Sequence, residues 1–305
     1  MQNLQQWIAQ YLLSCNYQKG LDSKTLKAYR IDLLQFEEFM RKESLELKRN
    51  NVVLYISSLH DNYQPRTIRR KIASAKAFCN YLEYEELIEE NPFTKLRLKL
   101  KAPSILPRTI PLTVIKALLS VAYQQKQATL SEKQEKALLR DIAVLELLFA
   151  TGIRVSELCS LELSDVHLDE GEVKIYGKGA KERFVQIANP AVIQALSDYW
   201  VANKQAIEAN GVFFINRLQK PLSDQSVRGI IKKYEKLAGV DLHITPHMFR
   251  HSFATLLLEE DVDIRYIQGL LGHSSIVTTQ IYTHIAGKKQ RDILSTKHPR
   301  NRMHF

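Results

Sequence analysis

Six residues in the C-terminal two thirds of the chain have side chains suited to breaking a phosphodiester bond without a metal ion. In chain order they are Arg154, Lys178, His247, Arg250, His273 and Tyr282. A phosphodiester is negatively charged and has a poor alkoxide leaving group, so its cleavage needs a nucleophile, a base, an acid and cations at its oxygens. Arginine suits the last role, because its guanidinium is always charged and can bind two oxygens at once.

The spacing of these residues indicates how they could meet at one phosphate. His247 and Arg250 are three residues apart, so on a helix both would lie on the same face. Arg154 follows a Gly that is predicted to end a helix, and Lys178 lies in the polar loop GKGAKE between two predicted strands. Taken singly, each of these residues is more often a packing or surface residue. Their ordered combination is what predicts a catalytic site.

The elements that would position these residues are mostly helices. In the C-terminal part, apolar periodicity and capping signals predict helices over 112–123, 136–150, 223–238, 246–259, 264–271 and 275–285, with a short one near Arg154. The stretches 172–176 and 183–187 are predicted to form an antiparallel hairpin around the Lys178 loop. The fold class is therefore mainly α with a small antiparallel β-sheet.

The N-terminal part carries a possible DNA-binding surface. Helices are predicted over 23–40 and 67–88, each with an apolar stripe. Basic residues that lie outside the apolar stripe of the helix predicted over 67–88 form a candidate DNA-binding face. It consists of Arg66, Arg69, Arg70 and Lys76. Three prolines four residues apart in 99–113 predict an extended linker, so we expect domains at 1–103 and 104–305.

Composition favours a polyanionic partner and an intracellular location. The 305 residues include 43 Lys and Arg against 33 Asp and Glu, a formal net charge of +10. The three cysteines are widely spaced and form no CxxC pair, so they predict neither a disulfide framework nor a zinc site. The N-terminus has no basic signal-peptide region and no long apolar run follows, so we expect a cytoplasmic protein with no membrane, metal or cofactor requirement.

The four stretches around the six residues resemble the active-site signature of the tyrosine recombinases, or phage integrase family, and most of all the Xer type. These stretches are TGIRVSEL, GKGAKER, HMFRHSFAT and LLGHSSIVTTQIYTH. The resemblance implies a strand-transferring enzyme in which Tyr282 attacks the scissile phosphate and forms a 3′-phosphotyrosine. It assigns Arg154, Arg250 and His273 to the phosphate oxygens, His247 to the base and Lys178 to the acid that protonates the leaving 5′-oxygen.

The resemblance also implies the architecture and the partners. Residues 1–103 would be a helical, SAM-like core-binding domain, and 104–305 an α+β catalytic domain, with the two forming a C-shaped clamp on duplex DNA. Lys181 and Arg183 would contact backbone phosphates. Glu157 is compatible both with an ion pair to Arg154 and with a plain helix-surface carboxylate.

Four subunits would assemble on two recombination sites, as a homotetramer or with a related recombinase. The tail 283–305 would dock in the neighbouring subunit, so truncation after Ala286 would abolish synapsis and leave single-site binding intact. A type IB topoisomerase and a non-catalytic DNA-binding regulator are the alternatives. The sequence leaves open the DNA target, the base-reading residues, the need for a partner or activator, and the choice between chromosome-dimer resolution and mobile-element integration.

Overall fold

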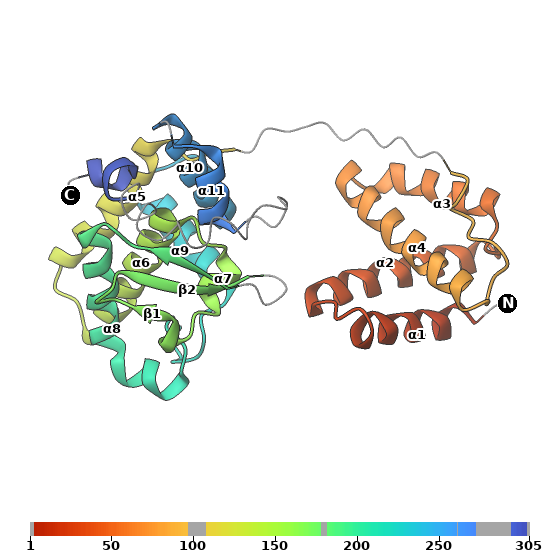
Figure 1. Cartoon of the computed structure of the whole chain (residues 1–305), viewed down its shortest axis with the longest axis horizontal. Helices are drawn as coiled ribbons and strands as arrows, with labels where there is room; N and C mark the ends of the chain where they lie inside the picture. Colours follow the sequence, from red (N-terminus) through yellow and green to blue (C-terminus); the bar gives the residue numbers. More distant parts are fainter. Residues whose placement is uncertain (1–2, 97–107, 178–181, 261, 273–293, 304–305) are drawn as a thin grey trace. The chain divides into compact units, whose positions relative to one another are not determined.

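The computed structural model describes residues 3–96, 108–177, 182–260, 262–272 and 294–303. Within these ranges the chain is mainly helical, and it divides into two compact units, residues 1–105 and 106–305 (Figure 1). The predicted domain boundary at residue 103 falls within 97–107, outside the described residues. No helix in the described part of the chain is long and apolar enough to cross a membrane.

The described part of the N-terminal unit is a bundle of four helices. They are α1 (Leu4–Tyr17), α2 (Ser23–Lys42), α3 (Arg49–Asn62) and α4 (Pro65–Tyr84). Helix α2 starts after Asp22, whose carboxylate accepts a 2.9 Å hydrogen bond from the Thr25 backbone N–H. Helix α4 starts at Pro65, a residue favoured at the first helical position because it has no N–H to leave unpaired. Helix α2 packs against the other three helices.

The core of this unit is rich in aromatic side chains. Its largest fully buried members are Tyr11, Phe36, Tyr55, Phe78 and Phe93. The apolar stripes of 23–40 and 67–88 face this core, so the prediction of helices there is confirmed. The second helix ends four residues earlier than predicted, because the chain turns at Glu86, which has a positive φ of 57°.

The C-terminal unit is built around one long buried helix. Its helices are α5 (Leu112–Gln124), α6 (Glu132–Thr151), α7 (Val155–Cys159), α8 (Pro190–Asn210), α9 (Asp224–Leu237), α10 (Pro246–Glu259) and α11 (Ile264–Leu271). Every residue of 141–151 in α6 is buried, and α5, α8, α9 and α10 all pack against this helix. A helix buried on all sides forms the centre of its domain. The helix predicted over 275–285 lies outside the described residues.

A three-stranded antiparallel sheet packs against these helices in the order β1 (Val166–His167), β2 (Glu172–Tyr176) and β3 (Glu182–Gln186). Val173 pairs with Val185 and Ile175 with Arg183 in the β2–β3 register. Val173, Ile175 and Val185 are buried in the core of the unit. The predicted hairpin is therefore confirmed, with its second strand starting one residue early, and the prediction of a mainly helical fold with a small antiparallel sheet is confirmed as well.

The last described segment, residues 294–303, packs on its own C-terminal unit. Leu294 joins the apolar cluster formed by α10 and α11, and Met303 joins the main core. The His298 ring is buried between the rings of Phe149 and Phe253, and its Nε2 lies 3.1 Å from the carbonyl oxygen of Phe149. In the single chain the side chains of these residues fill the core of their own unit, and docking of the tail in a neighbouring subunit stays a prediction.

Candidate active site

The end of helix α6 sets the position of Arg154. Gly152 ends the helix with a left-handed φ of 60°, and a Cβ at this position would lie 2.9 Å from side-chain atoms of both Phe253 and Leu271. Glycine therefore satisfies both the turn and the close packing of α10 and α11 against it. Two residues later, Arg154 has extended backbone angles and stands immediately before α7. Its side chain is 34% exposed, so the guanidinium is partly open to solvent.

Arg250 lies on α10 and connects the ends of two other helices. Its side chain is buried, and its Nη1 donates to the carbonyl oxygen of Gly152 at 2.9 Å, while its Nη2 donates to that of Leu271 at 2.6 Å. These carbonyls end α6 and α11, where the helix dipole is negative. Burial, followed by the charge of Arg154, lowers the pKa of Arg250 to about 10, so the group still carries its charge at neutral pH.

Glu157 is the carboxylate that organises this cluster. It is 6% exposed and accepts four hydrogen bonds. Two come from Arg154, from Nη1 to Oε1 at 2.6 Å and from the backbone N–H to Oε2 at 2.9 Å. Two come from Arg183, from Nη1 to Oε1 at 2.9 Å and from Nη2 to Oε2 at 2.6 Å. Of the two readings that the sequence left open, the ion pair to Arg154 is confirmed.

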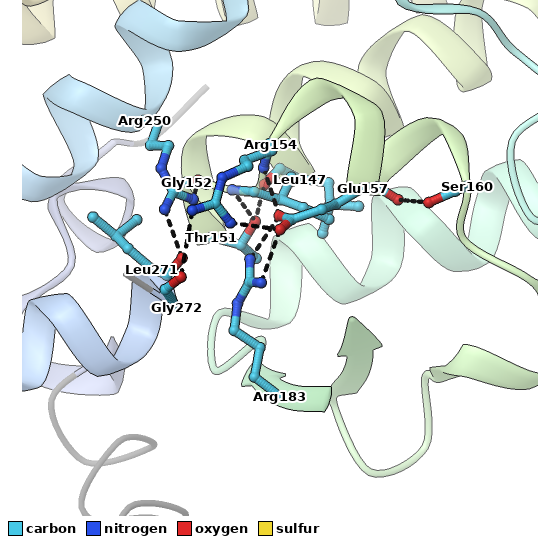
Figure 2. Close-up of polar contacts among 11 residues, drawn as sticks. Leu147, Thr151, Gly152, Arg154, Glu157, Ser160, Arg183, Arg250, Leu271 and Gly272 are labelled. Carbon is cyan, nitrogen blue, oxygen red and sulfur yellow. Dashed lines mark hydrogen bonds and ion pairs between the residues drawn. The ribbon is translucent and has the colours of Figure 1, made fainter. Parts of the chain in front are cut away.

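The ionisation of Glu157 follows from these contacts. Burial opposes its charge, but the hydrogen bonds and charges of Arg183 and Arg154 outweigh burial and hold its pKa below the ordinary value. Arg183 is itself only 13% exposed in its side chain. Its guanidinium is therefore engaged inside the protein, where the sequence had suggested a contact to a DNA phosphate. Figure 2 shows Arg154 and Arg183 converging on Glu157, with Arg250 beside Arg154.

The carboxyl end of α11 completes the described part of the site. The carbonyl oxygen of Gly272 accepts a 3.3 Å hydrogen bond from Nη2 of Arg154, next to the Leu271 carbonyl that binds Arg250. The carbonyl oxygens at the end of α11 thus bind the guanidinium groups of both Arg154 and Arg250 (Figure 2). His273 follows directly in the chain, but it lies outside the described residues, as do Lys178, Lys181 and Tyr282.

His247 is exposed in the first turn of α10, three residues before Arg250. Partial burial and then the positive charges of Arg228, His251, Arg250 and Arg154 lower its pKa below the ordinary value. The imidazole is consequently neutral at neutral pH, which is the form able to accept a proton. The predicted grouping of His247 and Arg250 near Arg154 agrees with these electrostatic couplings.

The candidate DNA-binding face on α4 is exposed at all four of its members, Arg66, Arg69, Arg70 and Lys76. Arg70 is engaged within the unit, because its Nη1 donates to the buried carboxylate of Asp32. The same carboxylate binds Lys71, 3.3 Å away and buried, and the hydroxyl of Ser74. This network fixes the orientation of α4 on α2 and so positions the basic face.

Comparisons with known proteins identify the class. Residues 8–86 match the model of the phage integrase N-terminal SAM-like domain, and residues 115–289 match that of the phage integrase family. Together they cover most of the chain, so the protein belongs to the phage integrase family of tyrosine recombinases, which are DNA strand-transferring enzymes. The four motifs that carry Arg154, Lys178, Arg250 and Tyr282 all lie inside the second match.

Within the family, the chain is most similar to recombinases of the Xer type. A tyrosine recombinase of Agathobacter rectalis is 53% identical over the full length of both chains. XerC of Bacillus subtilis is 33% identical and XerD of Halalkalibacterium halodurans 34%, over 98% of this chain and 98% and 100% of theirs. The chain is thus an Xer-like site-specific recombinase, and the topoisomerase and non-catalytic alternatives are not favoured.

Solved structures agree with this fold. XerH bound to palindromic difH in a post-cleavage complex has a TM-score of 0.69 at 22% identity, with 95% of this chain and 84% of that chain covered. The lambda integrase (75–356) dimer bound to a COC′ core site has a TM-score of 0.64 at 16% identity, with 89% and 95% covered. At these identities the likeness concerns the fold.

Proposed function

We propose that the cluster of Arg154 and Arg250 binds the scissile phosphate of a duplex DNA recombination site. The observation that carries this proposal is the convergence of two guanidinium groups on the carbonyls that end α6 and α11, with Arg154 partly open to solvent. Two cations held in place by backbone acceptors need no rearrangement when charge develops on the phosphate oxygens. Such preorganised charge is the main way an enzyme lowers this kind of barrier.

The reaction we propose follows the family pattern. The Tyr282 hydroxyl gives its proton to His247, and its oxygen attacks phosphorus to form a 3′-phosphotyrosine, while the bond to the 5′-oxygen breaks. Lys178 supplies the proton that turns the leaving 5′-oxygen into a hydroxyl, and His273 donates a hydrogen bond to the phosphate. The neutral imidazole expected from the lowered pKa of His247 supports its assignment as base. The phosphotyrosine keeps the phosphodiester energy, so religation needs no cofactor.

Replacement of the nucleophile tests this assignment. Tyr282→Phe is expected to bind DNA with unchanged affinity and to form no covalent adduct with a nicked suicide substrate on a denaturing gel, because phenylalanine has no attacking oxygen. Tyr84→Phe is the matched control, since Tyr84 is 84% exposed in the N-terminal unit. An adduct formed by the Tyr282 variant would show that another residue is the nucleophile.

The general acid is tested separately with a changed leaving group. Lys178→Ala should cleave normal DNA slowly, because the leaving 5′-oxygen then lacks its proton donor. A 5′-bridging phosphorothioate leaves without protonation, so it should restore much of the lost rate. Equal defects on both substrates would rule out the acid role.

We further propose that four subunits, identical or of two related kinds, act on two DNA sites. A lambda integrase tetramer bound to a Holliday junction has the same fold, with a TM-score of 0.64. Because residues 294–303 fill their own core, truncation after Ala286 would remove buried side chains as well as any intersubunit contact. A substitution such as Ile285→Asp is a cleaner test: it should keep binding to one site and lose the complex of two sites in a gel shift. Recombination by this variant at the full rate would contradict the assembly.

A further inference from the structure

Glu157 is shared unequally between its two arginines. Arg183 binds both carboxylate oxygens with its two Nη atoms, at 2.9 and 2.6 Å, in the forked geometry that makes arginine–carboxylate pairs strong. Arg154 uses one side-chain nitrogen on Glu157, at 2.6 Å, and a longer bond of 3.3 Å on the Gly272 carbonyl. Arg183 thus provides the main counter-charge of Glu157, and Arg154 keeps donors and charge for another partner.

The charges of the cluster support the same view. Arg154 and Arg183 pair with the Glu157 carboxylate, and Arg250 is coupled to the same carboxylate through its charge, so among the described residues of this cluster positive charges exceed negative charges by two. A tyrosinate that attacks a phosphodiester produces a transition state with two negative charges, which this excess matches. Without Arg183, Arg154 would be the only cation of the described residues that is paired with Glu157. Its charge would then be largely cancelled before DNA binds.

The packing around Arg183 leaves it little freedom to move to a phosphate. A Cβ placed on Gly272 would lie 2.8 Å from Cδ of Arg183 and 3.0 Å from its Nη1, so the side chain rests directly on this glycine. Gly272 has a left-handed φ of 64°, and this conformation at the end of α11 favours glycine as well. The Nε of Arg183 is buried and has no hydrogen-bond partner among the described residues, so the two Nη atoms alone hold the guanidinium.

We propose that Arg183 is a positioning residue for cleavage: it neutralises Glu157 and thereby keeps the charge of Arg154 available to the scissile phosphate, without touching DNA itself. The proposal rests on the proposed function, because it assumes that Arg154 binds the phosphate. It replaces the phosphate contact that the sequence had suggested for Arg183. It also assigns β3, which carries Arg183, a direct part in preparing the phosphate site.

A DNA substrate with an uncharged phosphate analogue distinguishes the electrostatic role of Arg183 from a purely structural role. Arg183→Gln should bind a single recombination site with unchanged affinity, but cleave a suicide substrate on the order of 10²-fold more slowly, the loss typical when one preorganised charge is removed. On a substrate with a methylphosphonate at the scissile position, the transition state has one negative charge fewer. The defect should then shrink to within about threefold of the unmodified protein, because less positive charge is needed.

The matched control is Lys174→Gln, which breaks the 3.0 Å ion pair between Lys174 and Glu182 on the same hairpin. This variant should cleave both substrates at the normal rate. Equal losses for Arg183→Gln on both substrates would assign Arg183 a purely structural role. Weaker binding with a reduced salt dependence would restore the direct phosphate contact. Either result would overturn the proposal.

A double variant tests the charge balance independently, so that the conclusion does not depend on the Arg183→Gln variant alone. Removing both partners in Glu157→Gln/Arg183→Gln restores the net charge beside Arg154, so this variant should cleave the normal substrate faster than Arg183→Gln. A double variant slower than the single one would overturn the proposal. Arg154→Lys serves as the reference in the same assay: if it cleaves normally, the proposed function fails, and if it is impaired while Arg183→Gln is normal, only the role of Arg183 fails.

Discussion

Two buried glutamates of the C-terminal unit, Glu146 on α6 and Glu157 on α7, are both bound by arginine, and they differ in what surrounds the pair. Glu146 is fully buried and accepts from Nε and Nη2 of Arg300, at distances of 2.8 to 3.1 Å, and from the Tyr123 hydroxyl at 2.8 Å. Arg300 is buried as well. Glu157 is also buried, at 6% exposed, but it is bound by two arginines, and one of them, Arg154, is a third exposed.

The difference shows how one kind of ion pair serves two purposes. At Glu146, one carboxylate meets one guanidinium away from water, so the pair is neutral and fastens residues 294–303 to α6. At Glu157, two guanidinium groups meet one carboxylate at the edge of solvent, so positive charge remains. The buried Glu146–Arg300 pair, in which the charges balance, holds the chain together. The cluster of Glu157, Arg154 and Arg183, in which positive charge is in excess and solvent has access, can bind an anion.

The largest expected effect is on stability, at the balanced pair. Arg300→Met should lower the free energy of unfolding by about 3–5 kcal/mol, because it leaves the Glu146 carboxylate charged and unpaired in the core. Urea unfolding at pH 7 measures this. Arg302→Met is the matched control, since the pair of Arg302 with Glu260 is exposed on the arginine side and is worth less than about 1 kcal/mol. Similar losses for both variants would contradict the structural role of the buried Glu146–Arg300 pair.

The next effect is on rate, at the unbalanced cluster. Arg154→Lys should slow cleavage by about 10²- to 10³-fold, because an ammonium cannot bind Glu157, the Gly272 carbonyl and a phosphate together. The free energy of unfolding should change by less than about 1 kcal/mol, because Arg183 still neutralises Glu157. Single-turnover cleavage and urea unfolding of the same variant give both numbers. A large loss of stability with a normal rate would reverse the roles of the two clusters.

A third effect depends on pH and concerns His298, next to the balanced pair. Burial, and then the charge of Arg300, lowers the pKa of His298 to about 4. The folded state therefore binds this proton less well than the unfolded chain, whose value is near 6.5. The contribution of neutral, buried His298 to the free energy of unfolding is therefore complete above pH 6.5. It decreases as the pH falls towards 4, by up to about 3 kcal/mol. Urea unfolding of His298→Gln between pH 7 and pH 4 should show a weaker pH dependence than the unmodified protein, and an equal slope would contradict this.

The smallest effect is expected on the basic face of α4. Arg66→Ala should weaken DNA binding by less than about tenfold and reduce the slope of log affinity against log salt by about 1, because one exposed phosphate contact is lost. Gel shifts at several salt concentrations measure both quantities. Arg70→Ala should in addition lower the free energy of unfolding, because the Arg70 side chain donates to the buried Asp32. Identical behaviour of the two variants would show that this ion pair has no structural role.

The sequence predicted those elements whose pattern is local. Periodicity predicted α2, α4, α9, α10 and α11, and the glycine after Thr151 predicted the end of α6. Helix α8 was missed, although its signals were present: Asn189 caps it through the Ala191 N–H, Pro190 opens it, and Gly211 ends it in a left-handed conformation. Helices α1 and α3 were also missed. Both begin without a side-chain cap, so the sequence marks their starts poorly.

Roles that depend on contacts between distant segments could not be predicted. Arg183 meets Glu157 across 26 residues, and Arg300 meets Glu146 across 154. In both cases the partner is decided by which elements pack together, and this packing does not follow from the spacing of residues along the chain. The motif residues Arg154 and Arg250 were recognisable because their order in the chain matched a known signature. The placement of Lys178, His273 and Tyr282 stays a prediction.

The way residues 294–303 join the C-terminal unit offers a route to chemical labelling. They insert side chains into an existing core, with Asn301 also bonded to Asn189 at 2.6 Å, and they add no strand to the sheet. A synthetic peptide with the sequence LSTKHPRNRM is therefore expected to bind a chain that lacks this segment. A fluorophore or isotope carried on such a peptide would report, from beside α6, on whether this binding site stays occupied while DNA strands are exchanged.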